Sequence, residues 1–339
     1  MTDTSHDTPI LEGRDLTKEF AVPGGGLFGR FRIAAVDRVS LALQEKPSIV
    51  SLVGESGSGK TTLSRMLLGL TPPTKGEVFF RGNDISALSR QDWHDFRRNV
   101  QPVFQDPFAI YNPFYRIERV LDLMVKNFKL ASSKSEAQRL VEESLAAVDL
   151  RPGDVIGRYP HQLSGGQAQR VMLARIFLVR PKIIIADEPV SMIDVAVRML
   201  FLNILLDFRD KYGISCLFMT HTLATAYYLG GQMMVLCFGR VVEWGDLEEI
   251  IAHPAHPYTQ ELLKSIPSPD PTERWADQVS LQQVERPLTH EASKCGYVER
   301  CPFATDICSQ QRPPAYVIGE NHYATCFLHR DLPIRGQQS

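Results

Sequence analysis

The sequence predicts an α/β protein in which a parallel sheet carries a phosphate-binding loop. Three observations point to this fold. An apolar run at Ile49–Val53 precedes a glycine-rich loop and then leucines at helical spacing. A β-branched run at Lys182–Ala186 is typical of a central parallel strand buried on both faces, and it ends in two acids. A further buried strand, Ile214–Met219, ends in Thr220 and His221.

Composition narrows the class of protein. The 339 residues exceed the usual size of one domain, and 44% hydrophobic residues supply ample core material. A net charge of -2 gives no basic footprint for nucleic acid. No run approaches eighteen apolar residues, and the polar, acidic first ten residues do not resemble a secretory signal. We therefore expect a cytoplasmic protein whose connection to a membrane comes through partner proteins.

Residues 54–62, Gly-Glu-Ser-Gly-Ser-Gly-Lys-Thr-Thr, fit a phosphate-binding loop between a strand and a helix. Glycines let successive backbone N–H groups point at phosphate oxygens, and the following helix adds its partial positive charge. Lys60 can reach the outer phosphates, and the Thr61 hydroxyl can ligate Mg²⁺. The predicted ATP contacts here are Gly54, Glu55, Ser56, Gly57, Ser58, Gly59, Lys60, Thr61 and Thr62.

The chain on either side of this loop alternates strands with helical segments. Strands are predicted at Ile10–Phe20, Ala34–Leu43, Ser48–Val53 and Lys75–Phe80, a short helix at Gln91–Arg98, and a glycine-turn hairpin at Met233–Phe238 and Arg240–Trp244. Residues 106–175 carry mainly helical signals, and Ser135 followed by Glu136 marks the start of one of these helices. Helical residues 246–266 close the compact domain, and a Pro-Ser-Pro-Asp-Pro segment follows as a linker.

Two polar segments are candidates for nucleotide chemistry. Ser164 can cap a helix that runs to Leu178, and the glycines that follow it permit close approach to an anion, although such a start is also common in a plain helix cap. Asp187 and Glu188 are neighbours at a strand end, so their side chains point to opposite faces and need different roles. Asp187 can orient Mg²⁺ through water, and Glu188 can polarise the attacking water.

The six cysteines divide into two groups. Cys216 and Cys237 lie in apolar strands and are predicted to be small core side chains. The other four crowd into the last 45 residues, where in a cytosolic protein they favour metal over disulfides: Cys295, Cys301, Cys308 and Cys326. Their spacing lacks a Cys-x-x-Cys pair, which is less typical of zinc than of an iron–sulfur cluster. Iron–sulfur, zinc and unligated thiols all stay open on the spacing alone.

Taken together, these motifs resemble the ATP-binding-cassette family of P-loop NTPases over about residues 10–265. The marks are GESGSGKTT at 54–62, Gln105, LSGGQ at 163–167, IIIADEP at 183–189, Ser191–Asp194 and His221. The tail at His256–Thr259 and the four-cysteine segment are similar to the ATPase subunits of oligopeptide and dipeptide importers. The glycine-rich insert at 23–30 resembles the second ATPase of the pair in such importers.

The resemblance implies a fold and domain boundaries. The cassette would contain a RecA-like parallel-sheet core, an antiparallel β subdomain and a helical subdomain at about 106–175. Residues 1–9 would be a disordered N-terminus, 10–265 the ATP-binding domain, 266–294 a linker and 295–339 a small Cys-rich C-terminal extension.

The resemblance also implies residue roles. Phe20 would stack on adenine, Gln105 would touch Mg²⁺ and sense the membrane subunits, and Glu188 would be the catalytic base. His221 and Lys60 would contact the γ-phosphate, and Asp194 would link the two ATP sites of a cassette pair. The signature Ser164, Gly165, Gly166 and Gln167 would contact ATP held by the opposite subunit. Mg²⁺ would be held by Thr61, Gln105 and Asp187.

Partners and cofactors follow from the same resemblance. They are ATP, Mg²⁺, a [4Fe–4S] cluster at the four cysteines, a second ATPase subunit, two membrane permeases and an extracytoplasmic binding protein. Cargo would be peptides, with oligosaccharides or another small solute as alternatives. A non-transport ABC ATPase acting on ribosomes or DNA, and a metal-cluster sensor with vestigial ATP binding, are rival functions. Departures from the family pattern are Thr222 after His221, Met192-Ile193, Pro47-Ser48 and Ala168.

Overall fold

The computed structural model describes residues 9–23, 30–191, 193–265 and 293–336. The chain forms two compact units, each assembled from separate stretches of sequence. Unit 1 contains Ile10, Leu43–Ile49 and Ala87–Met219. Unit 2 contains Leu11–Ala42, Val50–Ser86 and the chain from Thr220 onward.

Unit 1 contains parallel strands in the order β8, β7 and β6. Their bounds are Val100–Val103 for β6, Ile183–Asp187 for β7 and Ser215–Thr220 for β8. Every residue of β7 and β8 is buried, as expected for parallel strands that are covered on both faces. The sequence prediction of two central buried strands is therefore confirmed.

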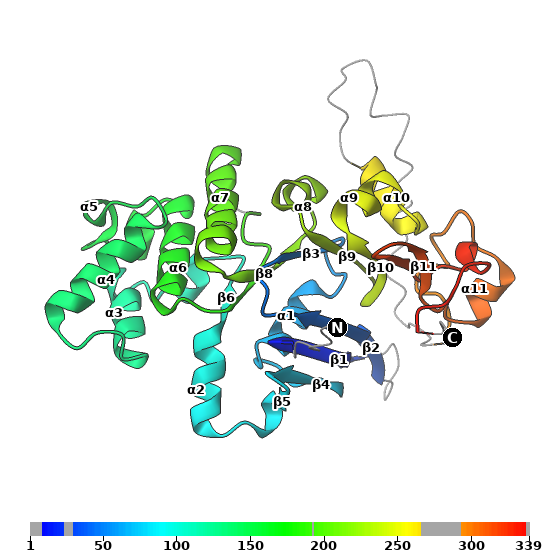
Figure 1. The fold of residues 1–339 in the computed structure, drawn as a ribbon, viewed down its shortest axis with the longest axis horizontal. Coiled ribbons are helices and arrows are strands. Elements are labelled where there is room, and N and C mark those ends of the chain that lie inside the picture. The colour runs from blue at the N-terminus through cyan, green and yellow to red at the C-terminus, as the bar shows by residue number, and fades with distance from the viewer. Residues whose placement is uncertain (1–8, 24–29, 192, 266–292, 337–339) are drawn as a thin grey trace, which may run out of the picture. The chain divides into compact units, whose positions relative to one another are not determined.

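Helices make up most of the rest of unit 1 (Figure 1). They are α2 (Arg90–Asn99), α3 (Glu118–Asn127), α4 (Lys134–Ala146), α5 (Pro152–Val155), α6 (Gly165–Val179) and α7 (Val195–Tyr212). Helices α3 and α4 both pack on α6, which is buried along most of its length. The start of α4 is two residues earlier than predicted, because Ser133 and not Ser135 accepts the capping bond from the Glu136 N–H.

Unit 2 contains two groups of strands. Strands β2 (Arg30–Leu43), β1 (Leu11–Pro23), β4 (Lys75–Phe80) and β5 (Asn83–Asp84) form an antiparallel sheet in that order. Strands β11 (Tyr316–Gly319), β12 (His322–Ala324), β10 (Arg240–Asp246), β9 (Gln232–Cys237) and β3 (Ile49–Val53) follow one another in a second sheet. The helices of unit 2 are α1 (Lys60–Leu67), α8 (Leu223–Leu229), α9 (Leu247–Ala252), α10 (Pro257–Lys264) and α11 (Asp306–Gln310). The predicted hairpin is confirmed, since β9 and β10 pair antiparallel.

The C-terminal segment 293–336 is built into unit 2. Strand β12 pairs antiparallel with β10, so this segment extends the same sheet. Tyr297 is 2% exposed and belongs to one hydrophobic core with Val235, Tyr258 and Leu262. Cys295 and Cys301 pack against the same core. Backbone pairing and a shared core therefore join this segment to the hairpin.

Parts of the predicted domain division lie outside the described residues. These are residues 1–8 of the predicted N-terminal segment, 266–292 of the predicted linker and 337–339 at the end of the predicted extension. Among the described helices, none is both long enough and apolar enough to cross a membrane.

Helices α6 and α7 approach each other closely at one glycine. A Cβ atom placed on Gly166 would lie 2.4 Å from Cγ1 of Val197, far inside normal contact distance. The neighbouring Gly165 has room, because the nearest atom to its Cβ position is 3.9 Å away. Gly166 therefore serves helix packing, whereas Gly165 does not.

We predict that Gly166→Ala lowers the free energy of unfolding by about 1–3 kcal/mol, the usual effect of overpacking a core. Val197→Ala in the same chain should restore most of that loss, because it removes the clashing Cγ atoms. Thermal or urea unfolding of the single and double variants measures both effects. Gly165→Ala is the matched control; if it destabilises the chain as much as Gly166→Ala, close packing against Val197 is not the cause.

Candidate functional site

The predicted phosphate loop connects strand β3 to helix α1, as the sequence indicates. Lys60 is the first residue of α1 and is 4% exposed. Its Nζ donates to the carbonyl oxygens of Gly54 at 2.8 Å and Glu55 at 3.0 Å. The Ser58 N–H also donates to the Glu55 carbonyl, at 3.1 Å. The loop thus curls around the lysine side chain, which bonds to two of the loop's own carbonyl oxygens.

The backbone of this loop contacts two other segments of unit 2. Gly59 has a φ of 111°, and a Cβ there would lie 2.3 Å from the carbonyl oxygen of Ala35 in β2. Only glycine fits this conformation and this close approach. The Gly239 N–H, in the turn between β9 and β10, donates to the Ser58 carbonyl at 2.7 Å. The loop geometry is therefore set by the surrounding fold as well as by its own sequence.

A buried hydrogen-bond chain reaches this loop from β10. The carboxylate of Glu243, 0% exposed, accepts the backbone N–H groups of Ala255 and His256, each at 2.8 Å. Nδ1 of His256 accepts the Tyr258 N–H at 3.1 Å and so caps α10. The Tyr258 hydroxyl then accepts the N–H of Glu55 at 2.9 Å. Helix α10 is thereby fixed with a tyrosine oxygen against the loop backbone.

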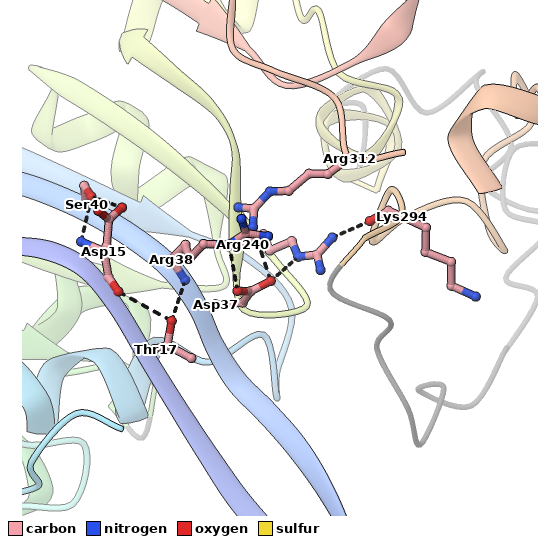
Figure 2. Close-up of polar contacts among 8 residues, drawn as sticks. All are labelled: Asp15, Thr17, Asp37, Arg38, Ser40, Arg240, Lys294 and Arg312. Atoms are coloured by element: carbon pink, nitrogen blue, oxygen red, sulfur yellow. Dashed lines mark hydrogen bonds and ion pairs between the residues drawn. The ribbon is translucent and has the colours of Figure 1, made fainter. Parts of the chain in front are cut away.

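Asp37 organises a second buried cluster in unit 2 (Figure 2). Its Oδ2 accepts from Nε of Arg240 at 2.8 Å and from a terminal nitrogen of Arg312 at 3.3 Å. Arg240 also donates to the carbonyl oxygen of Lys294 at 2.5 Å. Burial and the neighbouring Arg240 lower the pKa of Arg312 to about 10. The Asp37 N–H donates to the carbonyl of Gly239 at 2.8 Å, so this cluster joins the C-terminal segment to the turn that supports the loop.

Unit 1 carries the two predicted acids at the end of β7. Asp187 is the last residue of the strand and is 8% exposed, whereas Glu188 is partly exposed. Glu188 has a φ of 44°, a left-handed conformation that is uncommon for a residue with a side chain. Its N–H donates to the Met219 carbonyl at 2.9 Å, and its own carbonyl accepts from the Ser191 hydroxyl at 2.9 Å. The strand therefore ends at Asp187 and the chain turns at Glu188, so the opposite-face arrangement of the two acids stays a prediction.

The signature residues and Asp194 occupy helix starts in unit 1. The Ser164 hydroxyl accepts the Gln167 N–H at 3.2 Å, and the Gln167 side chain accepts the Ser164 N–H at 3.0 Å, which completes a capping box. Asp194 caps α7 by accepting the Val197 N–H at 3.0 Å. Ser164 and Asp194 are both exposed. Each of the two side chains thus has a local structural role that the sequence indicated only for Ser164.

Gln169 is a site residue that the sequence reasoning missed. It is 0% exposed, and its Nε2 donates to the carbonyl of Pro189 at 2.7 Å, with longer contacts to those of Gln105 at 3.3 Å and Phe104 at 3.4 Å. This single amide joins the signature helix, the segment after Glu188 and the Gln105 segment. The sequence feature that could have indicated this role is a glutamine, Gln169, among the apolar residues of the buried face of α6.

The other predicted nucleotide contacts lie on exposed parts of their units. Phe20 in β1 is 45% exposed, with Nζ of Lys18 5.7 Å from its ring centre. Gln105 in unit 1 and His221 in unit 2, directly after β8, are exposed. Thr61 is exposed in the first turn of α1. An exposed aromatic ring on a strand is accessible to a ligand, and stacking of Phe20 on adenine stays a prediction.

The four C-terminal cysteines lie in one segment of unit 2 and influence one another. Burial, with smaller contributions from the other three thiols, raises the pKa of Cys326 to about 12. Burial also raises the pKa of Cys295 and Cys301. Yet the described residues include no group of three or more His, Cys, Asp or Glu side chains placed to hold a metal ion. The structure does not support the predicted iron–sulfur cluster, because the thiols are gathered without forming a ligand set.

Two family models match the chain. One described as "ABC transporter" matches residues 36–191. The other, described as "Oligopeptide/dipeptide transporter, C-terminal region", matches residues 242–308. The first match contains the phosphate loop and both acids, and the second contains Tyr258 and three of the four cysteines.

Relatives of known description align over almost the whole chain. The oligopeptide transport ATP-binding protein AppF of Bacillus subtilis is 36% identical over 337 residues, covering 97% of this chain and 100% of its own. The di/tripeptide transport ATP-binding protein DppF of Pseudomonas aeruginosa is 34% identical over 327 residues, covering 94% of this chain and 99% of its own. A solved dimeric ATP-binding cassette, MJ0796 bound to ADP and Pi, superposes with a TM-score of 0.61 at 28% identity, covering 70% of this chain and 98% of that one.

We predict that the chain loses stability between about pH 6.5 and pH 4 in a way that depends on His256. Burial lowers the pKa of His256 from 6.5 to about 4, so in this range the unfolded state binds the proton more readily. Above pH 6.5 His256 is neutral in both the folded and the unfolded state, and the free energy of unfolding has its full value. As the pH falls from 6.5 to 4, protonation of the unfolded state lowers the free energy of unfolding by roughly 3 kcal/mol at most. Urea unfolding across this pH range measures the loss.

The matched variant is His256→Asn, which keeps an oxygen able to cap α10 but cannot titrate. It should show a shallower fall in the free energy of unfolding between pH 6.5 and pH 4. Equal slopes for the native chain and the variant would show that protonation of His256 is not involved.

Proposed function

The chain belongs to the ATP-binding proteins of oligopeptide and dipeptide ABC transporters, and from this premise we propose that it binds and hydrolyses ATP to power the import of peptides. The single observation that carries the proposal is the loop at 54–62, which is curled around a buried Lys60 between a strand and a helix. Backbone N–H groups and a lysine at the start of a helix are suited to the phosphates of ATP.

The proposed roles of the site residues are those of an ABC ATPase. Glu188 is the general base for the attacking water, and Lys60 and His221 stabilise charge on the γ-phosphate. Mg²⁺ would be held by Thr61, Gln105 and Asp187, whose hydroxyl, amide and carboxylate oxygens are the donors it prefers, and it would neutralise phosphate charge. Adenine would stack on Phe20. The partly exposed Glu188 beside the buried Asp187 supports the division between base and metal ligand.

A second cassette completes the proposed site. The exposed Ser164 at the start of α6, followed by Gly165 and Gly166, offers an anion site to a nucleotide held by another subunit. Asp194 would communicate between the two sites. The cassette MJ0796, to which this chain is similar, is dimeric with ADP and Pi bound. We therefore assign a second ATPase subunit as a partner, with the chain alone a poor ATPase.

Unit 1 offers a surface for a membrane subunit next to Gln105. The segment after this residue exposes Phe114 at 85%, Phe108 at 40% and Tyr115 at 46%. Beside them lies a pocket of about 260 Å³ lined by Ile110, Tyr111, Asn112, Tyr115, Arg116, Ile117, Arg119, Val120, Leu123 and Pro160. Exposed aromatic groups around an apolar pocket suit a helix of a partner protein. A permease bound here would hold the chain at the cytoplasmic side of the membrane, in a complex that also contains a second permease and an extracytoplasmic binding protein.

The proposed domain boundaries follow the sequence prediction. The ATP-binding domain would run from residue 10 to 265, with its helical part at about 106–175. Residues 1–9 would precede it, 266–294 would be a linker and 295–339 the Cys-rich extension. The succession of α3, α4, α5 and α6 within 118–179 supports the helical part.

The cargo is proposed from the relatives. AppF and DppF are named for oligopeptide and di/tripeptide transport. Co-purification of the assembled complex, followed by ATPase assays with peptides or oligosaccharides, distinguishes the proposed cargo from its alternative. Stimulation by oligosaccharides alone would contradict peptide import.

An iron–sulfur cluster at the four cysteines stays a prediction from the family resemblance. Iron and sulfide content after anaerobic purification tests it, with Cys301→Ser as the comparison. Equal iron and sulfide in the two proteins would rule the cluster out.

We predict that Glu188→Gln reduces ATP turnover by at least about a hundredfold, the usual contribution of a general base, while ATP binding is kept. Phosphate release by the assembled complex and binding of a fluorescent ATP analogue measure the two properties separately. Glu142→Gln on the exposed face of α4 is the matched control and should behave as the native chain. Unchanged turnover in Glu188→Gln would contradict the assignment of the base.

A further inference from the structure

Every polar group of one phosphate-loop residue is bonded within unit 2. The N–H of Glu55 donates to the hydroxyl of Tyr258 at 2.9 Å. Its carbonyl accepts from Lys60 at 3.0 Å and from the N–H of Ser58 at 3.1 Å. Its carboxylate accepts two bonds from the guanidinium of Arg300, at 2.9 and 3.1 Å. The carboxylate contact joins residues 245 positions apart in the sequence.

Arg300 is itself held in place by its surroundings. The same guanidinium donates to Glu261 in α10 at 3.0 Å, and its carbon lies 5.7 Å from the ring centre of Tyr297 and 6.0 Å from that of Phe238. Tyr297 in turn donates to Glu261. The Arg300 side chain is 13% exposed, whereas the Glu55 carboxylate is 41% exposed. The bidentate bond to Glu55 is the main cause of the raised pKa of Arg300, so the cation is permanent.

The charge of Glu55 gives this contact a consequence for nucleotide binding. A phosphate loop receives a strongly anionic ligand, and a carboxylate on the same loop repels it. A bidentate guanidinium neutralises the carboxylate and also fixes its direction, which a single-point cation does not do as well. The guanidinium of Arg300 therefore offsets the charge that Glu55 brings to the loop.

We propose that Arg300 of the C-terminal segment is a positioning residue for the phosphate loop, acting through Glu55 to neutralise and orient the loop for ATP. The C-terminal segment is therefore part of the nucleotide site's support. The proposal rests on the proposed function, since it presumes ATP binding at this loop.

The test is a double-mutant cycle between Glu55 and Arg300, read as the Kd for MgATP of the full chain. Arg300→Ala should weaken ATP binding roughly fivefold to tenfold, a range discounted for the partly exposed carboxylate. Glu55→Gln removes the loop carboxylate and is the background in which Arg300→Ala is measured again. In the Glu55→Gln chain, Arg300→Ala should have little further effect, because the charge that Arg300 compensates is gone.

Kinetics separate positioning from a general loss of structure. In the assembled complex, Arg300→Ala should raise KM for ATP while kcat stays within about twofold, as expected when binding alone is lost. Arg300→Lys keeps the charge without the bidentate geometry and should fall between the native chain and Arg300→Ala. Arg335→Ala is the matched control, since Arg335 lies on the same segment over the rings of Trp244 and Tyr323.

The outcomes distinguish this proposal from the proposed function. Lys60→Ala should abolish ATP binding; if it does not, the proposed function fails. If Lys60→Ala abolishes binding but Arg300→Ala leaves the Kd unchanged, the positioning role alone is wrong. An equal effect of Arg300→Ala in the native and Glu55→Gln chains also overturns it, because Arg300 would then act by another route.

Discussion

A loop that binds an anion through backbone N–H groups has to be fixed by its other polar groups, because an N–H that bonds to the anion cannot also bond to the protein. In this chain the carbonyl of Ser58 is bonded by Gly239, and that of Gly54 by Lys60. The glycine at 59 allows the backbone to press against Ala35. The rest of unit 2 can be understood as the support that this loop requires.

The C-terminal segment contributes to that support through two charge clusters. One joins Arg300 to Glu55, and the other joins Arg240 and Arg312 to Asp37 beside the turn that contacts Ser58. Breaking the Arg240–Asp37 pair would leave a buried, uncompensated ion, whereas the Glu55 carboxylate stays partly in contact with solvent. A segment of the chain that forms no part of the loop thereby influences its geometry.

Local sequence patterns predicted the parts of the fold that depend on local chemistry. Strands β7 and β8 are apolar over most of their length and buried, as their sequence predicts, and the loop at 54–62 lies between its strand and helix. The prediction places the start of α4 two residues too late, because Ser133 and Ser135 are both residues that favour the N-cap position. Neighbouring residues of similar chemistry cannot be ranked without the packing of the helix.

Long-range contacts escaped prediction for a different reason. Nothing in the periodicity near Glu55 or Arg300 indicates that they pair, and Gln169 could be flagged as a polar residue in an apolar helix but not assigned its partners. The cysteines show the reverse: their crowding in sequence predicted a cluster that their side-chain positions do not support. The most direct test of the account is a crystal structure of the full chain with MgATP. It should show phosphate oxygens bonded to the loop amides and Lys60, with the Arg300–Glu55 pair intact; phosphates bound elsewhere, or a broken pair beside an unchanged loop, would contradict it.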